Sequence, residues 1–216
     1  MILVNDSLPD DAPLVVLLHG YGADDRDLTG LVPYLPKEFR YASLRAPQRG
    51  PGGMGFQWFP LRFRPDGMSL DTSAEAVAGI SADAVTAAEG VWAELDGLPA
   101  APRAMVGFSQ GAITGMQAWR LRPDGFVCGA VLSGYVAVGE LPGDAEFARR
   151  RPPVFWGRGL QDAVIPGPAI AATTPWLAEH ATVTEHIEPY AGHEVTLAEL
   201  QALSAFLREY LGGAEG

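Results

Sequence analysis

Residues 104–119 read AMVGFSQGAITGMQAW: a short apolar segment, a G-x-S-x-G motif, and then a segment with helical spacing of apolar residues. This order predicts a buried strand at Ala104–Val106, a sharp turn at Ser109 and a helix after it. Gly107 and Gly111 suit so tight a turn, because a Cβ at either position would collide with the neighbouring strand or helix. The stretch therefore predicts a nucleophile elbow, in which strained backbone dihedrals raise a serine hydroxyl above the sheet. The alternative interpretation is a plain Gly/Ser turn that caps a helix.

On both sides of this motif, short segments rich in Val, Leu and Phe alternate with longer segments whose apolar residues recur every three or four positions. Such alternation is typical of a parallel sheet that is covered by helices on both faces. The expected strands are Leu14–Leu18, Tyr41–Leu44, Ala104–Val106, Val127–Leu132, Val154–Trp156 and Val183–Ile187. The expected helices are Asp25–Tyr34, Thr72–Leu95, Ala112–Leu121, Pro168–His180 and Thr196–Leu211. We therefore predict a single α/β domain over residues 1–216 with a mostly parallel, twisted sheet, and we expect ligands to bind beyond the carboxyl ends of its strands.

A glycine-rich turn, HGYG at residues 19–22, follows the expected strand Leu14–Leu18. Such a turn can offer a backbone N–H to a ligand, and we assign that role to Tyr21. The helix that begins at Gln110 directs its positive end and its free N–H groups to the place where a negatively charged tetrahedral oxygen would form. Tyr21 and Gln110 are therefore the predicted oxyanion hole. His19 suits a structural role, orienting the loop through hydrogen bonds, better than a role as a base.

A serine nucleophile needs a base whose pKa lies near neutrality. Of the four histidines, His193 lies in YAGHEV, between the expected strand Val183–Ile187 and the last expected helix, where a loop can place it over the edge of the sheet. His186 lies inside that strand and His180 lies near a helix end, so we expect both to be structural or solvated. His193 is therefore the predicted base.

The third predicted member of the site is an acid that follows a strand between the serine and the histidine. Asp162 fits this requirement, because it lies in the loop directly after the expected strand Val154–Trp156. Asp124 and Asp144 lie in the same interval, but neither directly follows a core strand. The carboxylate of Asp162 would hold the His193 ring in the productive tautomer and stabilise the imidazolium as it forms. The alternative is an aspartate that only stabilises a turn or caps a helix.

The composition excludes several classes of partner. Acidic residues outnumber basic ones by 26 to 15, for a formal net charge of −11, which repels phosphate backbones and anionic lipids. We therefore expect neither nucleic-acid binding nor stable membrane association, and no apolar segment approaches the roughly 20 residues needed to span a bilayer. The first residues lack the features of a secretory signal, and the single cysteine, Cys128, cannot form an intramolecular disulfide, so we expect a cytosolic protein.

Five segments together resemble one known family. They are LLHGYGAD at 17–24, APQRGPGGMGFQWFPL at 46–61, GFSQGA at 107–112, GLQDAVIP at 159–166 and YAGHEV at 190–195. Over nearly its whole length, the chain resembles the phospholipase/carboxylesterase family of the α/β-hydrolases, which includes acyl-protein thioesterases and bacterial carboxylesterases. The resemblance implies the same site residues, namely Ser109, Asp162, His193, Tyr21 and Gln110. It also implies, as in many members, a homodimer.

The aromatic residues Phe56, Trp58 and Phe59 follow a Gly-rich loop, where they can line an acyl pocket or fill the core, and we leave both interpretations open. Pro60 stands where many eukaryotic members of the family have an aspartate, so the likeness is closer to small bacterial esterases than to depalmitoylating enzymes. The segment Gly134–Pro153 is too short for a large helical lid. We therefore predict an open, shallow site that favours short or medium acyl chains.

Together these residues predict a serine carboxylesterase that hydrolyses a small-molecule ester or thioester through an acyl-enzyme on Ser109. That chemistry requires neither a metal nor an organic cofactor. Two alternatives share the fold: a non-catalytic binding protein whose triad geometry is broken, and an enzyme that carries out perhydrolysis or C–C bond cleavage.

Overall fold

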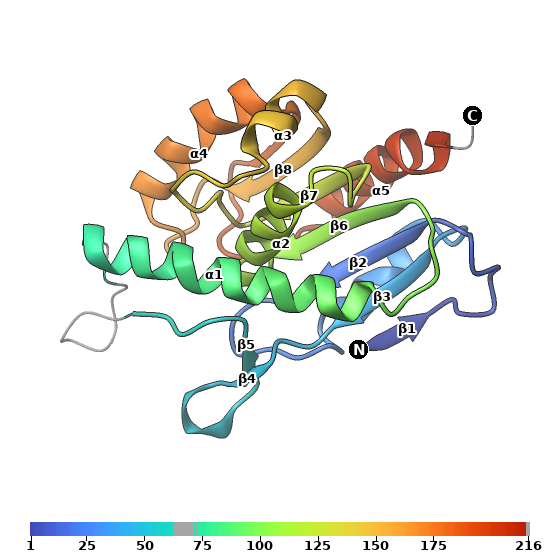
Figure 1. Ribbon diagram of the computed structural model, residues 1–216, viewed down its shortest axis with the longest axis horizontal. Helices are drawn as coiled ribbons and strands as arrows, with labels where there is room; N and C mark the ends of the chain where they lie inside the picture. The colour runs from blue at the N-terminus through green and yellow to red at the C-terminus, as the bar shows by residue number, and fades with distance from the viewer. Residues whose placement is uncertain (63–70, 72, 215–216) are drawn as a thin grey trace.

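The structure, a computed structural model, describes residues 1–62, 71 and 73–214. Within these residues the strands form a seven-stranded sheet in the order β1-β3-β2-β6-β7-β8-β9 and a separate two-stranded hairpin, β4-β5 (Figure 1). The strands of the large sheet are β1 (Ile2–Val4), β2 (Leu14–Leu18), β3 (Arg40–Leu44), β6 (Arg103–Phe108), β7 (Cys128–Leu132), β8 (Pro153–Gly159) and β9 (Thr182–Glu188). The hairpin consists of β4 (Gln48–Arg49) and β5 (Phe56–Gln57). Neighbouring strands of the large sheet are parallel, except that β1 runs antiparallel to β3.

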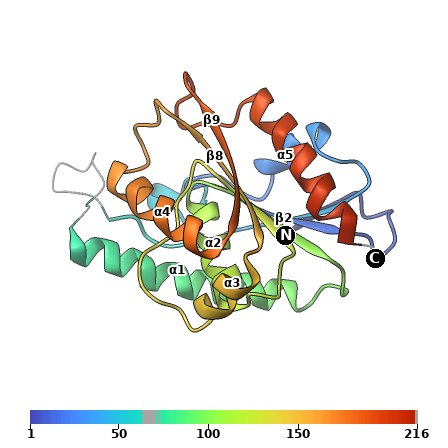
Figure 2. The ribbon, with the colours of Figure 1, turned by 90° about the horizontal axis from the view of Figure 1, so that it is seen from above.

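Helices cover both faces of this sheet. They are α1 (Ala74–Leu95), α2 (Gln110–Leu121), α3 (Asp144–Arg150), α4 (Gly167–His180) and α5 (Leu197–Tyr210). Helices α1 to α4 contribute to the buried apolar cluster on one face. Helix α5 packs on the other face together with the short 3-10 helix Leu28–Tyr34. Figure 2 shows α5 and α1 on opposite sides of the sheet.

Strand β2 shows why this sheet needs continuous apolar segments. All five of its side chains are at most 2% exposed. Val16 and Leu18 belong to the cluster on the α1 side, whereas Val15 and Leu17 belong to the cluster on the α5 side. Because successive residues of a strand point to opposite faces, a strand that helices cover on both sides must be apolar at every position.

The strands expected from the sequence are all present, with boundaries that differ by up to three residues. The α-helix expected at Asp25–Tyr34 is wrong: Leu28–Tyr34 forms a 3-10 helix that contains Pro33. Pro33 lacks the N–H that an α-helix would use at this position, which weakens an α-helix here, although α4 accommodates Pro175 within its own length. Thr72, the first residue of another expected helix, lies outside the described residues, and α1 begins at Ala74.

Strands β1, β4 and β5 and helix α3 are not predicted by the sequence pattern, because each is too short to show a periodicity. Helix α3 lies in the segment Gly134–Pro153, whose length predicts no large lid. Its Phe147 ring packs against Trp119 and Trp176, with ring centroids 5.1 and 5.6 Å apart. This part of the chain is therefore held on the core.

Candidate active site

The turn between β6 and α2 holds Ser109 in a backbone conformation that few residues adopt. Its φ is 53° and its ψ is −118°, a strained region that costs about 1–3 kcal/mol. A Cβ on Gly107 would lie 2.5 Å from the Cα of Ala112, and one on Gly111 would overlap the carbonyl oxygen of Leu18. The steric reason predicted for both glycines is therefore confirmed. Ser109 itself is partly exposed just beyond the carboxyl end of β6.

His193 contacts Ser109 and Asp162 contacts His193, each from a separate loop. The Nε2 atom of His193 lies 2.9 Å from Ser109 Oγ, and its Nδ1 atom lies 2.8 Å from Asp162 Oδ2. Because a carboxylate only accepts hydrogen bonds, Nδ1 carries the ring proton, and the Nε2 lone pair is left to accept the hydroxyl proton of the serine. The side chains of His193 and Asp162 are 19% and 7% exposed. The structure thus brings together the three side chains that the sequence singles out.

The carboxylate of Asp162 has a second set of partners. Its Oδ1 atom accepts hydrogen bonds from the N–H groups of Val164 and Ile165, at 2.8 and 3.1 Å. These bonds to the following backbone form an Asx turn, the turn role that was the alternative interpretation of this residue. Both interpretations describe the same side chain, because Oδ1 stabilises the turn while Oδ2 faces the histidine.

The loops that carry Asp162 and His193 also contact each other. The N–H of Gln161 donates to the carbonyl of Ala191 at 3.0 Å. The Phe108 ring packs against the imidazole of His193, with ring centroids 4.9 Å apart. The imidazole is therefore oriented by a carboxylate, by a neighbouring loop and by an aromatic ring.

The predicted oxyanion donors lie on the two elements that border Ser109. Gln110 is the first residue of α2, so its N–H has no acceptor within the helix. Tyr21 follows Gly20, and a Cβ on Gly20 would lie 3.5 Å from the Cβ of Ser109. The loop after β2 therefore passes directly beside the serine. The role of both N–H groups as oxyanion donors stays a prediction.

The other three histidines have structural partners. His19 is fully buried, both of its ring nitrogens lie within hydrogen-bond distance of backbone groups, and burial lowers its pKa. The structural interpretation of His19 is therefore confirmed. His180 stacks on Trp176, with ring centroids 4.2 Å apart, and His186 Nε2 lies 2.9 Å from a carboxylate oxygen of Glu188.

The arrangement agrees with a comparison of the whole chain against known families. The model of the phospholipase/carboxylesterase family matches residues 3–211. The chain belongs to the phospholipase/carboxylesterase family. Membership confirms the resemblance noted from the five sequence segments and places the chain in a family of carboxylic ester hydrolases with the α/β-hydrolase fold.

Two solved structures and one relative illustrate the similarity, at 18% to 28% sequence identity. The crystal structure of esterase PE8 has a TM-score of 0.74 and 26% identity, and the match covers 97% of this chain and 98% of that chain. The Bacillus cereus carboxylesterase shares the fold, with a TM-score of 0.72 at 18% identity over 96% of this chain and 92% of that chain. A probable carboxylesterase of Oryza sativa subsp. japonica is 28% identical over 122 residues. Those residues are 56% of this chain and 46% of the rice protein, so the match spans less than half of that relative.

In this phospholipase/carboxylesterase family member, two of the three aromatic residues that follow the Gly-rich loop lie in the core. Trp58 and Phe59 are 3% and 1% exposed and belong to the apolar cluster on the α1 side. Phe56 is half-buried beside two guanidinium groups, those of Arg45 and Arg49, at 4.8 and 4.4 Å from its ring centroid. Core filling therefore describes Trp58 and Phe59, and substrate contact by Phe56 stays a prediction.

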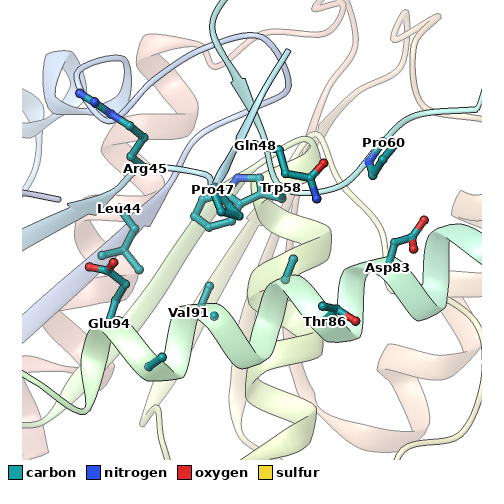
Figure 3. Close-up of a pocket in the computed structure, with 13 residues that line it drawn as sticks. Leu44, Arg45, Pro47, Gln48, Trp58, Pro60, Asp83, Thr86, Val91 and Glu94 are labelled. Atoms are coloured by element: carbon teal, nitrogen blue, oxygen red, sulfur yellow. The ribbon is translucent and has the colours of Figure 1, made fainter. Parts of the chain in front are cut away.

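Trp58 also borders a cavity of about 410 Å³ between α1 and residues 44–60. Figure 3 shows this cavity with Val91 and Glu94 of α1 on one side and Pro47 and Trp58 on the other. The three predicted catalytic side chains are not among its lining residues. The small exposed part of the Trp58 side chain therefore borders a cavity that is separate from Ser109.

Glu199 of α5 is a buried acid that the sequence interpretation missed. It is 2% exposed, it touches Gly157 of β8, and its Oε1 atom has no hydrogen-bond partner among the described residues. Burial raises its pKa to about 7. Its N–H donates to Thr196 Oγ1 at 3.1 Å, so the T-x-x-E spacing at 196–199 is the sequence signal of a capping box. That signal marks the start of α5 but does not reveal that the carboxyl group is buried.

Proposed function

We propose that this chain is a serine carboxylesterase that hydrolyses short- to medium-chain carboxylic esters or thioesters through an acyl-enzyme on Ser109. The observation that carries the proposal is the continuous hydrogen-bonded series Ser109 Oγ, His193 and Asp162, with separations of 2.9 and 2.8 Å. A nucleophile, a base within reach of its proton and an acid that orients the base are the parts that acyl transfer through serine requires.

The proposed reaction has two similar halves. His193 Nε2 takes the proton of Ser109 Oγ as that oxygen attacks the acyl carbonyl carbon, and the N–H groups of Tyr21 and Gln110 stabilise the resulting oxyanion. The tetrahedral intermediate collapses, and the departing alcohol or thiol takes the proton from His193. Water then attacks the acyl-enzyme, giving its proton to His193, and the second collapse returns that proton to Ser109 and releases the carboxylic acid. Asp162 stabilises the imidazolium in both halves.

An apolar cavity of about 180 Å³ offers a place for the acyl chain in this proposal. Tyr135 and Val138 from the loop after β7, Ile80 of α1 and Pro166 before α4 are among its lining residues. The loop begins beside the nucleophile, because a Cβ on Gly134 would lie 3.3 Å from the carbonyl oxygen of Ser109. Ser109, Asp162 and His193 do not line this cavity, so its use by the acyl chain rests on the position of Gly134 and is part of the proposal, as is the preference for short or medium chains.

The test is the hydrolysis of p-nitrophenyl acetate and butyrate by the wild type and by Ser109→Ala. We expect the substitution to lower kcat by at least about 10³-fold, because removal of the nucleophile leaves only binding and oxyanion stabilisation. Covalent labelling by a fluorophosphonate probe should disappear in the same variant, while its circular dichroism spectrum stays unchanged. Residual activity within tenfold of the wild type would refute the role of Ser109.

The same experiment separates the alternatives. A binding protein without catalytic geometry would not react with the fluorophosphonate in its wild-type form. An enzyme with perhydrolase or C–C hydrolase chemistry would be labelled but would turn over a chain-length series of esters and thioesters poorly. That series also decides between ester and thioester substrates.

Three further properties belong to the proposal. We propose that residues 1–216 fold as one domain, that the protein lies in the cytosol and that it forms a homodimer. Sedimentation velocity tests the oligomeric state, and cell fractionation tests the location. None of the helices in the described part of the chain is long and apolar enough to cross a bilayer.

A further inference from the structure

The two proposed oxyanion donors lie on different elements, and one short segment is hydrogen-bonded to both. Gln110 begins α2, whereas Tyr21 lies in the loop after β2. Residues Phe56–Phe59, which we name the bridging segment, include β5 and continue past it. The stabilisation of an oxyanion depends steeply on donor positions, because the donors must lie about 2.7–3.1 Å from the oxygen. The contacts that fix the distance between α2 and the loop after β2 therefore affect the rate of the reaction.

The side chain of Gln110 joins α2 to the bridging segment. Its Oε1 atom accepts a hydrogen bond from the Trp58 N–H at 2.9 Å, and its Nε2 atom donates to the Phe59 carbonyl at 2.7 Å. Gln110 is 2% exposed. Both ends of the amide are thus used inside the protein, so an apolar side chain here would leave a buried N–H and a buried carbonyl without partners.

The bridging segment is in turn joined to the loop after β2 at three points. The indole Nε1 of Trp58 donates to the His19 carbonyl at 2.8 Å. The Phe56 carbonyl accepts from the Gly22 N–H at 2.9 Å, and the Phe56 N–H donates to the Ala23 carbonyl at 2.8 Å. The proposed donor at position 21 lies between these attachment points. Gln110, the bridging segment and the loop therefore form one continuous hydrogen-bonded unit around Ser109.

We infer that the Gln110 side chain and the Trp58 indole are positioning residues that set the distance between the two oxyanion donors. The inference rests on the proposed function, since it assigns a role within the same reaction. Gln110 acts twice in this scheme: its backbone N–H faces the reacting oxygen, and its side chain holds the segment that positions the other donor. A displacement of one donor by about 1 Å is enough to lower a rate about 10²-fold.

Three variants test this inference. Gln110→Met keeps an unbranched side chain of similar length and removes both amide hydrogen bonds. Trp58→Phe keeps an aromatic ring in the core, although a smaller one, and removes the hydrogen bond to His19. The matched control is Gln117→Met, because Gln117 is also a buried glutamine of α2, at 1% exposed, but its Oε1 accepts from Arg120 at 2.6 Å, away from the donors.

The measurements are kcat and KM for p-nitrophenyl butyrate and the affinity of an alkyl trifluoromethyl ketone, all per titrated active site. The ketone accepts Ser109 Oγ at its carbonyl carbon and forms a hemiketal oxyanion, so its affinity reports on the donors. We expect Gln110→Met to lower kcat and ketone affinity in parallel by about 10²-fold and Trp58→Phe to lower both by about tenfold. KM should change less than about threefold, because substrate binding precedes formation of the oxyanion. Gln117→Met should leave kcat and ketone affinity within about twofold of the wild type.

The outcomes separate the inference from the proposed function. If Ser109→Ala remains active, the proposed function fails and the inference fails with it. If Ser109→Ala is inactive but Gln110→Met and Trp58→Phe keep wild-type kcat and ketone affinity, only the inference is overturned. It is also overturned if kcat falls while ketone affinity does not. Should Gln110→Met not fold, Trp58→Phe decides by the same measurements.

Discussion

The two ends of helix α2 differ in what their side chains do. At the start, Ser109 is partly exposed and has a strained φ of 53°. At the end, Arg120 is fully buried, and all five of its N–H donors are used, at 2.6 to 2.9 Å. Two of these bonds go to the carboxylate of Asp144, the first residue of α3, and the guanidinium also lies 4.9 Å from the Trp176 ring centroid of α4.

This difference suggests how one helix serves both chemistry and stability. A strained residue persists only where the surrounding structure leaves it no alternative. At the elbow, close packing at Gly107 and Gly111 leaves Ser109 no alternative, whereas the Arg120 contacts join the other end of α2 to α3, α4 and the segment between β7 and α3. We therefore expect substitution of Ser109 to lower activity but not stability. Substitution of Arg120 should lower stability but not activity.

The largest expected effect on stability is that of Arg120→Met. Removal of one partner from a buried ion pair leaves the other charge without compensation and costs about 3–5 kcal/mol in the free energy of unfolding. Urea denaturation followed by tryptophan fluorescence measures this loss. The kcat of Arg120→Met per titrated active site should stay within about twofold of the wild type. Ser109→Ala should instead lose its activity and keep the free energy of unfolding of the wild type. If Arg120→Met lost kcat as well as stability, the two ends of α2 would not differ in the way that we expect.

Glu199 extends the comparison to a buried acid whose Oε1 atom has no hydrogen-bond partner among the described residues, whereas the carboxylate of Asp144 pairs with Arg120. Burial tends to raise the pKa of Asp144, but the hydrogen bond and charge of Arg120 outweigh burial and hold that pKa below its ordinary value. Its contribution to stability is present above its unfolded pKa and is lost as the pH falls. For Glu199, the pKa is instead raised from 4.5 to about 7. Its contribution is present below pH 4.5 and is lost as the pH rises through 7.

We therefore expect the wild type to lose up to about 3 kcal/mol from this one group between pH 4.5 and pH 8. Glu199→Gln cannot ionise, so its free energy of unfolding should fall less over the same range. The measurement is urea denaturation of both proteins at pH 5 and pH 8. Parallel losses in the two proteins would show that Glu199 does not titrate in this window.

The smallest expected effect is that of Arg149→Ala in α3. Arg149 and Glu146 form a bidentate pair at 2.6 and 2.7 Å, as short as the Arg120 pair, but their side chains are 70% and 42% exposed. Water screens an exposed pair and its side chains lose entropy on pairing, so distance alone does not predict stability. We expect no measurable change in Tm by calorimetry. A drop in Tm as large as that of Arg120→Met would mean that burial does not distinguish the pairs.

The sequence predicts two kinds of feature of the site. Some depend on residues that are close together in the chain, and others follow from the order and direction of the strands. The elbow depends on Gly107, Ser109 and Gly111, which lie within five positions of one another. Asp162 and His193 are far apart in the chain, but each follows a parallel strand, and the carboxyl ends of parallel strands meet at one edge of the sheet. Their contact could therefore be expected without knowing any side-chain packing.

Other features depend on packing that the alternation of strands and helices does not encode. The partners of the Gln110 amide lie 52 and 51 positions away in the chain, and nothing in the G-x-S-x-G motif indicates where they are. The same holds for the aromatic residues, because a Trp such as Trp58 can line a pocket or fill a core with the same sequence context. The 3-10 helix at Leu28–Tyr34 shows the converse error, in which apolar spacing predicts an α-helix but does not distinguish it from a shorter 3-10 helix that contains Pro33.

The single cysteine has a practical consequence for handling the protein. Cys128 is fully buried, and burial raises its pKa to about 12, so its thiol is a poor nucleophile at neutral pH. Met54, between β4 and β5, is 77% exposed. Met54→Cys would therefore carry the only thiol open to maleimide chemistry, two residues before Phe56. A fluorophore, spin label or solid support could be attached there in a single defined orientation without altering the native cysteine.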